Sequence, residues 1–365
     1  MPRASQTSGI RPCHDLRGYW LAVFLLVSTQ LTAAQLKFIQ EKGQTWIRAE
    51  NAPRDSTLNL YLVDPDTGGM GPAMFAKVHR DGDAWVLRPS FPLAHGNHYR
   101  AILHSGIGGE IASENLKVPA KLAPPPKLEA IYPTAQQLPA NLLKFYLYFD
   151  RPMREGRDIF SQIHIEDNAG QRIHAPWRRL ELWSADEKRL TLWIHPGRVK
   201  RGVNLREQLG PVLMPGREYD LVLDKTICSA DGIPIGQEIR HSFRTLPEDY
   251  VRPLPDSWTL VVPASGTTDP LQVHSPEPLD HALVPKNLSV FCQGEKMEIQ
   301  NTVAHPGESS WSVLPAKPWV RGIYELVAGQ ALEDLAGNTP ERVFDTELTA
   351  PAPLPSRRKI LFRVD

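Results

Sequence analysis

Histidines and carboxylates that could hold a metal ion stand close together at two places in the sequence. His95 and His98 are separated by two residues, and zinc prefers imidazole ligands held close together. No Cys or carboxylate is spaced to complete that site, so the pattern favours a solvated turn. Residues 64–69 (DPDTGG) present alternating oxygen donors as a calcium loop does, but they lack its later donors and its bidentate Glu. We therefore expect a strand-connecting turn there, no metal site and no cofactor.

Residues for nucleophilic catalysis are equally sparse. The sequence contains no Gly-x-Ser-x-Gly motif, which marks the nucleophile in one large class of acyl-transfer folds. Residues 105–109 (SGIGG) form a glycine-rich stretch, but no helix pattern follows to complete a phosphate cradle. These patterns predict no catalytic residues and favour a non-enzymatic protein.

Aromatic side chains offer the more specific candidate. Along a strand, side chains alternate between faces, so Tyr146 and Tyr148 oppose the apolar Phe145 and Leu147. The same alternation places the tryptophans of the following strands on the face opposite to that of Leu180, Leu182 and Leu192. Aromatic faces stack on sugar rings and also anchor protein contacts. The candidate ligand-binding face comprises Tyr146, Tyr148, Trp177, Trp183 and Trp193.

A segment of the same chain is the alternative occupant of this face. Residues 197–214 contain Val203, Leu205 and Leu209, which need a surface to bury against, and an exposed apolar patch would be a liability. The sequence leaves internal coverage and a binding face both open. The basic residues of this segment indicate a solvated loop, with a carboxylated glycan or envelope polymer as a more speculative partner; they are Arg198, Lys200, Arg201 and Arg206.

Short strands must position these residues. In the middle of the chain, residues 143–149 alternate apolar and polar side chains, the period of a strand with one buried face. Residues 163–165 and 171–173 flank a turn composition and predict a hairpin. Proline is also abundant, with 34 in 365 residues, and is hard to reconcile with long helices. The chain is therefore predicted to be all-β.

Internal repetition divides the chain into three modules. A strand that ends at proline, followed by Gly and Tyr at the start of another strand, occurs at 85–99, 192–219 and 311–324. Trp85 and Trp311 share the parity of apolar neighbours and are expected to lie in module cores. Proline clusters mark the boundaries. The predicted divisions are 1–34, an export signal; 35–120, a β-sandwich module; 127–246, a module with the inserted loop 197–214; 256–348, a third module; and 349–365, a Pro-rich linker with a terminal strand.

The middle module resembles a known family, the bacterial immunoglobulin-like domain of the surface-layer-protein (SbsA) type. The resemblance rests on the proline turn at Tyr132-Pro133, on Phe149-Asp150-Arg151-Pro152-Met153 and on Gly216-Arg217-Glu218-Tyr219. The third module matches in its late turn, Asp334-Leu335-Ala336-Gly337-Asn338, and the first module only over 85–99. The resemblance implies tandem immunoglobulin-like β-sandwich domains that serve as a spacer, an adhesin or an enzyme accessory, and it implies no catalytic residues.

The first 34 residues read as an export signal. Arg3, Arg11 and Arg17 precede an apolar run, and Thr32-Ala33-Ala34 is a small-residue cleavage site before Gln35. The apolar run is too short to span a bilayer comfortably, so we expect it to be cleaved, with an uncleaved N-terminal anchor as the alternative. No membrane span is expected after its removal. We expect an exported protein in the periplasm, at the cell surface or outside the cell.

Charge and cysteine content narrow the expected partners. Removing residues 1–34 leaves 38 basic and 40 acidic residues, so charge gives no reason to expect nucleic acid. Cys228 and Cys292 remain, either as a disulfide or as two separate thiols. The sequence predicts a non-enzymatic structural or adhesive protein of the cell envelope, with an envelope polymer, glycan or protein as partner. Carbohydrate binding through the aromatic face is the alternative.

Overall fold

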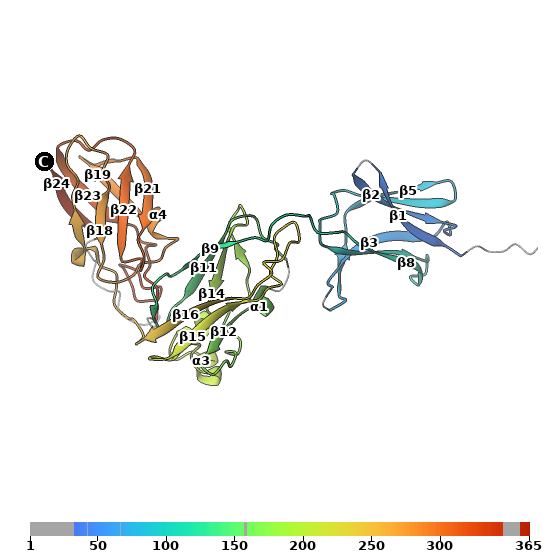
Figure 1. Cartoon of the computed structure of the whole chain (residues 1–365), viewed down its shortest axis with the longest axis horizontal. Helices are drawn as coiled ribbons and strands as arrows, with labels where there is room; N and C mark the ends of the chain where they lie inside the picture. The colour runs from blue at the N-terminus through green and yellow to red at the C-terminus, as the bar shows by residue number, and fades with distance from the viewer. Residues whose placement is uncertain (1–32, 42, 66, 157–158, 346–357) are drawn as a thin grey trace, which may run out of the picture. The chain divides into compact units, whose positions relative to one another are not determined.

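The computed structural model describes residues 33–365 except 42, 66, 157–158 and 346–357. Within these residues, six four-stranded sheets form three successive modules of two sheets each (Figure 1). This confirms the predicted all-β class of tandem sandwich modules. Nearly all of the predicted export signal lies outside the described residues, and the first strand begins at Gln35.

The first module contains eight strands. Its two sheets have the orders β1-β2-β6-β5 and β4-β3-β7-β8. The strands are β1 (Gln35–Glu41), β2 (Gln44–Glu50), β3 (Thr57–Val63), β4 (Met70–Ala73), β5 (Ala76–Asp81), β6 (Ala84–Pro89), β7 (His98–His104) and β8 (Glu110–Lys117).

The middle module has sheets β13-β14-β11-β9 and β10-β16-β15-β12. Only the β10–β16 pairing in these two sheets is parallel. The strands are β9 (Leu128–Tyr132), β10 (Gln137–Pro139), β11 (Lys144–Phe149), β12 (Ile163–Asp167), β13 (Leu182–Trp183), β14 (Arg189–Trp193), β15 (Glu218–Leu223) and β16 (Ile239–Leu246).

The third module has sheets β17-β18-β22-β21 and β20-β19-β23-β24. The terminal strand pairs with β23 along its whole length and so completes the second sheet. The strands are β17 (Thr259–Val261), β18 (Leu271–His274), β19 (Leu288–Cys292), β20 (Glu295–Lys296), β21 (Ile299–Ala304), β22 (Ser310–Pro315), β23 (Gly322–Ala328) and β24 (Lys359–Val364).

Helices are short in the described part of the chain, as its proline content leads one to expect. Two of them, α2 and α3, belong to the inserted region of the middle module. They are α1 (Ile159–Gln162), α2 (Pro196–Val199), α3 (Asn204–Leu209), α4 (Val284–Asn287) and the 3₁₀ helix η1 (Pro255–Ser257). None of the described helices combines the length and apolar character needed to cross a membrane.

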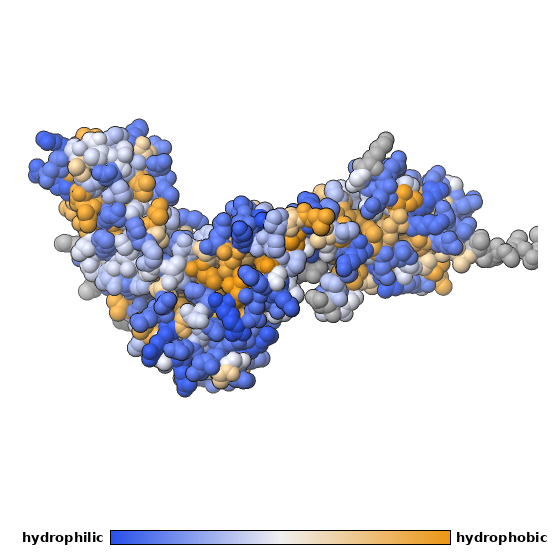
Figure 2. All heavy atoms as spheres, viewed as in Figure 1, coloured by the Kyte–Doolittle hydropathy of each residue, from blue (hydrophilic) through white to orange (hydrophobic). Residues whose placement is uncertain are grey.

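Strand alternation builds the cores as the sequence indicates. Phe145, Leu147 and Phe149 of β11 point into the middle core. The predicted hairpin is present, since Glu166 bridges Arg172 and Ile173 N donates to Ile165 O at 2.8 Å. Figure 2 shows a mostly hydrophilic viewed surface with separate hydrophobic patches, as is usual for modules that bury their apolar faces.

The residues expected to be equivalent core positions in the three repeats are not equally buried. Trp311 is fully buried in the third core, and Leu192 is fully buried in the middle one. Trp85 lies on the same face as Leu87 but is only half-buried, because it stands at the end of the β2–β6 pairing. Its indole N–H donates to Pro53 O at 3.2 Å, and Arg80 stacks 5.4 Å from its ring centre.

Candidate functional site: the joint between the middle and third modules

The outward face of sheet β13-β14-β11-β9 carries a continuous set of aromatic and basic side chains, which we call the joint face. Tyr146 of β11 pairs with Tyr132 of β9 on one side and Thr191 of β14 on the other. Opposite residues in antiparallel strands share a face. The joint face therefore comprises Tyr132, Lys144, Tyr146, Tyr148, Arg189, Thr191 and Trp193.

A buried ionic cluster links the joint face to the third module. Lys144 Nζ lies 3.2 Å from Asp280 Oδ2 and 2.5 Å from Glu333 Oε2. Burial alone would lower the pKa of Lys144, but the two carboxylates outweigh it and raise that pKa. Tyr146 donates its hydroxyl to both oxygens of Asp280, at 2.9 and 2.7 Å. Asp280 is only 4% exposed, so each of these partners compensates a desolvated charge.

Stacked aromatic rings lie beside this ionic cluster. The His281 ring lies parallel to that of Tyr132, with centroids 3.4 Å apart, and meets the edge of Tyr148 at 5.6 Å. Burial lowers the pKa of His281 to about 4, so its ring is neutral at neutral pH. A neutral ring suits a stacked position beside tyrosines, where a charge would lose its hydration.

A buried glutamate adds a further contact between the two modules. Glu308 of the third module is fully buried, and its carboxylate accepts the Thr134 backbone N–H at 3.0 Å and the Thr134 hydroxyl at 2.5 Å. Burial raises the pKa of Glu308 despite these hydrogen bonds. The Thr134 hydroxyl in turn accepts the Gly307 N–H. Thr134 therefore has polar contacts to two consecutive residues of the third module.

The late turn of the third module, residues 334–338, inserts into the middle module. Leu335 belongs to the middle core, and its carbonyl accepts the Leu143 N–H at 3.0 Å. Gly337 packs so closely that a Cβ there would lie 2.1 Å from Leu143 Cδ1. The two modules are thus interlocked by backbone as well as by side chains.

The connecting segment is tied to both modules. Asn141 of the middle module exchanges two hydrogen bonds with the backbone of Asp249. Asn338 of the third module donates to the same Asp249 carbonyl at 3.2 Å. A linker whose Asp249 is bonded to both modules restricts their relative motion more than a proline-rich spacer alone would.

Three carboxylates meet beside this linker. Ligand oxygens of Asp249, Glu277 and Asp334 all lie within 4.8 Å of one another, a separation that a hard cation such as Ca²⁺ can bridge. Burial first, and then the neighbouring carboxylates, raise the pKa of Glu277 and of Asp334 to about 8 each. The three residues lie far apart in sequence and share no spacing motif, so no sequence pattern indicated this cluster.

The inserted segment 197–214 supports the middle module and reaches the linker. Val199, Val212 and Leu213 lie in the middle core. Arg206 contacts Glu248 in the linker, and Arg201 lies 2.8 Å from Asp345 of the third module. The basic residues expected in a solvated loop therefore mostly make specific contacts, and Arg198 is buried.

The five predicted ligand residues do not gather on one face. Tyr146, Tyr148 and Trp193 lie on the joint face as expected. Trp183 instead pairs with Leu190 and points inward, because β13 aligns with β14 one residue away from the expected register. Trp177 bridges Ile194 and is 3% exposed in the core. Ligand binding by these five residues stays a prediction.

The third module, rather than residues 197–214, covers the tyrosines of the joint face. Asp280 contacts Tyr146, and His281 contacts Tyr148. Trp193 is flanked by Lys144 at 5.9 Å and Arg178 at 5.0 Å from its ring centre. The outward aromatic residues therefore serve a protein contact within the same chain.

The remaining sequence candidates make local contacts. Asp64 N donates to Gly69 O at 2.8 Å, which closes the expected turn, and His95 Nδ1 lies 3.0 Å from Pro119 O. Gly109 N donates to Ser105 Oγ within the glycine-rich turn. Cys228 and Cys292 are both free thiols.

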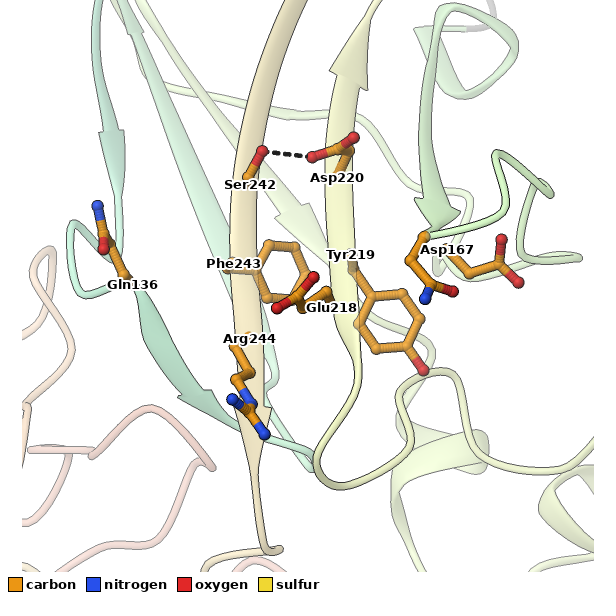
Figure 3. A pocket seen from close by; sticks show the side chains of 9 residues that line it. Gln136, Asp167, Glu218, Tyr219, Asp220, Ser242, Phe243 and Arg244 are labelled. Atoms are coloured by element: carbon orange, nitrogen blue, oxygen red, sulfur yellow. Dashed lines mark hydrogen bonds between the residues drawn. The ribbon is translucent and has the colours of Figure 1, made fainter.

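A concave surface of about 520 Å³ lies over the other sheet of the middle module. Figure 3 shows the side chains that line it. Ser242 Oγ donates to Asp220 Oδ1 at 2.5 Å, while Tyr219 and Phe243 are buried with their rings stacked at 5.8 Å. Asp220 and Ser242 face each other as paired residues of β15 and β16.

Comparisons with known proteins find weak likenesses to solved structures of other proteins. No family model matches the sequence, and no curated protein matches it. The chain is similar to native Escherichia coli alpha-2-macroglobulin spanning domains MG0-NIE-MG1, at 12% identity and a TM-score of 0.23, covering 66% of this chain and 71% of that one.

Two further solved structures show likenesses of the same strength. Chicken CNTN1 FN1–FN3 domains match at 10% identity and a TM-score of 0.22, covering 90% of this chain and 97% of that one. The N-terminal part of the bacterial S-layer protein SbsC matches at 10% identity and a TM-score of 0.26, covering 66% of this chain and 44% of that one. At these values the likenesses carry no argument about function.

Proposed function

We propose that the chain is an exported, non-enzymatic structural or adhesive protein of the cell envelope, built from immunoglobulin-like modules of the SbsA surface-layer type. The joint carries this proposal. Buried charges, stacked rings and an inserted turn all serve to hold the middle module against the third. A spacer or adhesin gains a defined reach from such a fixed relation between modules, because a free hinge would let the modules fold back on each other.

The polar character of the joint also supports a structural role. Replacing a buried ion pair by apolar side chains is often neutral or stabilising, so such pairs are poor devices for stability alone. Their contribution is to specify one arrangement, since Asp280 finds both of its partners, Lys144 and Tyr146, only in the docked state. We propose that this specificity is why the joint face is aromatic and charged.

Carbohydrate binding by the joint face is the weaker alternative. Tyr146 is 5% exposed, and its hydroxyl is bonded to Asp280. A sugar would have to displace the third module in order to stack on that ring. We therefore do not assign the polysaccharide function to these aromatics.

Expression of the full chain with a C-terminal tag in a bacterial host tests the proposal. We expect the tagged protein outside the cytoplasm, with Gln35 as its first residue by mass spectrometry, and increased retention of the cells on a surface under flow. The Leu25→Arg/Leu26→Arg variant, which breaks the apolar run, is the control and should stay in the cytoplasm. Cytoplasmic retention of the wild-type chain, or unchanged attachment of cells that display it, would contradict the proposal.

A further inference from the structure

The terminal strand β24 leaves one edge of its sheet open. It stands last in the sheet order β20-β19-β23-β24, beside β23 (Figure 1). The 3₁₀ helix η1 also contacts β24, but among the described residues no backbone hydrogen bond joins these two elements. A free strand edge presents a row of N–H and C=O groups to which a further strand can pair.

The register with β23 shows which backbone groups face the open edge. Ala328 N donates to Arg358 O at 2.8 Å, and these residues are opposite each other when the register of β23 and β24 is continued by one pair. Opposed residues of an antiparallel ladder alternate between hydrogen-bonded and non-hydrogen-bonded pairs. The backbone groups that bond to β23 are therefore those of residues 360, 362 and 364, and those that point outward belong to residues 359, 361 and 363.

The edge of β24 is longer and more regular than the other described edges of the third module. Its pairing with β23 runs over six consecutive residue pairs without a register shift. By contrast, β17 has three residues, β20 has two, and the register of β21 shifts between Ile299 and Asn301. Short strands, bulges and prolines are devices that prevent edge pairing, and β24 contains none of them.

Apolar side chains are exposed beside this edge. Leu361 is 63% exposed, and Ile323, which lies on the same outward face of the sheet, is 62% exposed. The other face of β24 carries Phe362 and Val364, which are buried in the third core. A strand added at this edge would therefore cover Leu361 and leave the core as it is.

The sequence of β24 is complementary to itself in the antiparallel direction. With Phe362 opposite Phe362 of a second copy, Lys359 lies opposite Asp365 of that copy, and the reverse pair forms by symmetry. Opposite charges in directly opposed positions stabilise a strand pair, whereas like charges destabilise it. The charges of this strand therefore favour one antiparallel register between two copies.

The same register accommodates the remaining side chains. Leu361 lies opposite Arg363 of the second copy, whose apolar stem can cover it while the guanidinium stays in water. Within one chain, Lys359 pairs with Glu325 and Asp365 with Arg363, but both pairs are solvent-exposed. Exposed ion pairs contribute little, so these charges can exchange partners at small cost.

We propose that the edge of β24 binds a second copy of this chain, with the two copies of β24 paired antiparallel about a two-fold axis. Contacts in which both copies use the same surface are the commonest in homo-oligomers. The outward backbone groups of residues 359, 361 and 363 supply the hydrogen bonds, and the Lys359–Asp365 pairs fix the register. The edge shares no residue with the joint, so this proposal goes beyond the proposed function and does not depend on it.

Analytical ultracentrifugation of residues 35–365 over a range of concentrations tests the proposal. We expect a monomer–dimer equilibrium with a Kd of about 10 μM, because one strand pair buries a small interface. Asp365→Lys places lysines opposite each other and should weaken dimerisation about tenfold. The double variant Lys359→Asp/Asp365→Lys restores opposite charges in the same register and should recover most of the lost affinity.

Two further variants locate the interface. Glu295→Lys is the matched control, because it makes the same charge change on β20, at the other edge of the same sheet, and should leave the Kd unchanged. Leu361→Pro removes an outward N–H but no bond to β23, so it should abolish dimerisation while the chain stays folded by circular dichroism.

A wild-type chain that stays monomeric at every concentration up to about 1 mM, a hundred times the expected Kd, would overturn the proposal and favour a strand of another protein as the occupant of this edge. A dimer that Asp365→Lys weakens no more than Glu295→Lys does would also overturn it, because the interface would then lie elsewhere. Failure of the double variant to recover affinity would contradict the proposed register.

Discussion

Buried carboxyl groups set how the joint responds to pH. The pKa of Glu277 and of Asp334 is about 8 in the folded chain, against about 4 when unfolded. Between these values the folded state binds more protons than the unfolded state, so the free energy of unfolding falls as pH rises. His281 acts oppositely and only below its unfolded pKa, since its folded pKa is about 4.

Asp334→Asn and Glu277→Gln should therefore flatten the pH dependence of stability between about pH 6.5 and 8, where any contribution of His281 is the same in wild type and variants. We expect the wild-type free energy of unfolding to fall relative to that of each variant by on the order of 1–3 kcal/mol across this window. Urea denaturation of residues 35–365 at several pH values measures the difference. Parallel curves for wild type and variants would show that the two carboxyls titrate normally.

Individual tryptophans show how far a residue can be placed from sequence. Parity correctly put Tyr146 and Tyr148 on the outward face, because β11 is a regular strand with one apolar side. It failed for Trp183, because β13 has only two residues and its register is set by its pairing with β14. A shift of one residue moves every side chain to the other face, and nothing in so short a strand fixes the register.

Among the elements, the turn at residues 334–338 has the clearest double role. Asp334 accepts from the backbone N–H groups of Ala336 and Asn338 and so closes the turn. Gly337 adopts φ +80° and lies against Leu143 of the middle module. A turn motif that the sequence shows as part of one module thus also docks that module to its neighbour.

Gly337→Ala should undock this turn, because the new Cβ would lie 2.1 Å from Leu143 Cδ1. Gly294→Ala is the matched control, with φ +84° in the same module and nothing within 4 Å of its Cβ. In both variants an alanine must adopt a left-handed backbone conformation, which costs about 1 kcal/mol. We therefore expect Gly337→Ala to lower the free energy of unfolding by about 1–3 kcal/mol more than Gly294→Ala does, the cost of overpacking against Leu143. Urea midpoints of the two variants compare these losses, and equal losses would mean that the turn does not bear on Leu143.

The pairing of the terminal strand could not be predicted from the sequence. The alternation in β24 predicts a strand, and its residues Phe362 and Val364 are buried in the third core. Its partner β23 lies more than thirty residues earlier, beyond a proline-rich segment. Local patterns predict that a strand forms, whereas pairing depends on non-local contacts that no local pattern carries.

At the scale of the whole molecule, the sequence predicts modules but not their joint. The residues that meet there come from strands, turns and a linker that are each ordinary in their own module. Lys144 and Asp280 are 136 residues apart, and neither stands in a motif. Their meeting is a property of the docked pair, so a single sequence presents the joint face only as unexplained aromatics on a polar side.

If the joint is stiff, spin labels placed in the two modules should show one narrow distribution of distances. Labels at Asn168→Cys and Glu295→Cys, both exposed, in a Cys228→Ser/Cys292→Ser background allow the measurement by pulsed electron resonance. Lys144→Met should broaden the distribution, because leaving Asp280 buried without its cation costs about 3–5 kcal/mol. Lys359→Met removes an exposed pair with Glu325 inside the third module and should leave the distribution narrow. A broad wild-type distribution would mean that the modules hinge freely and that the joint does not set their relation.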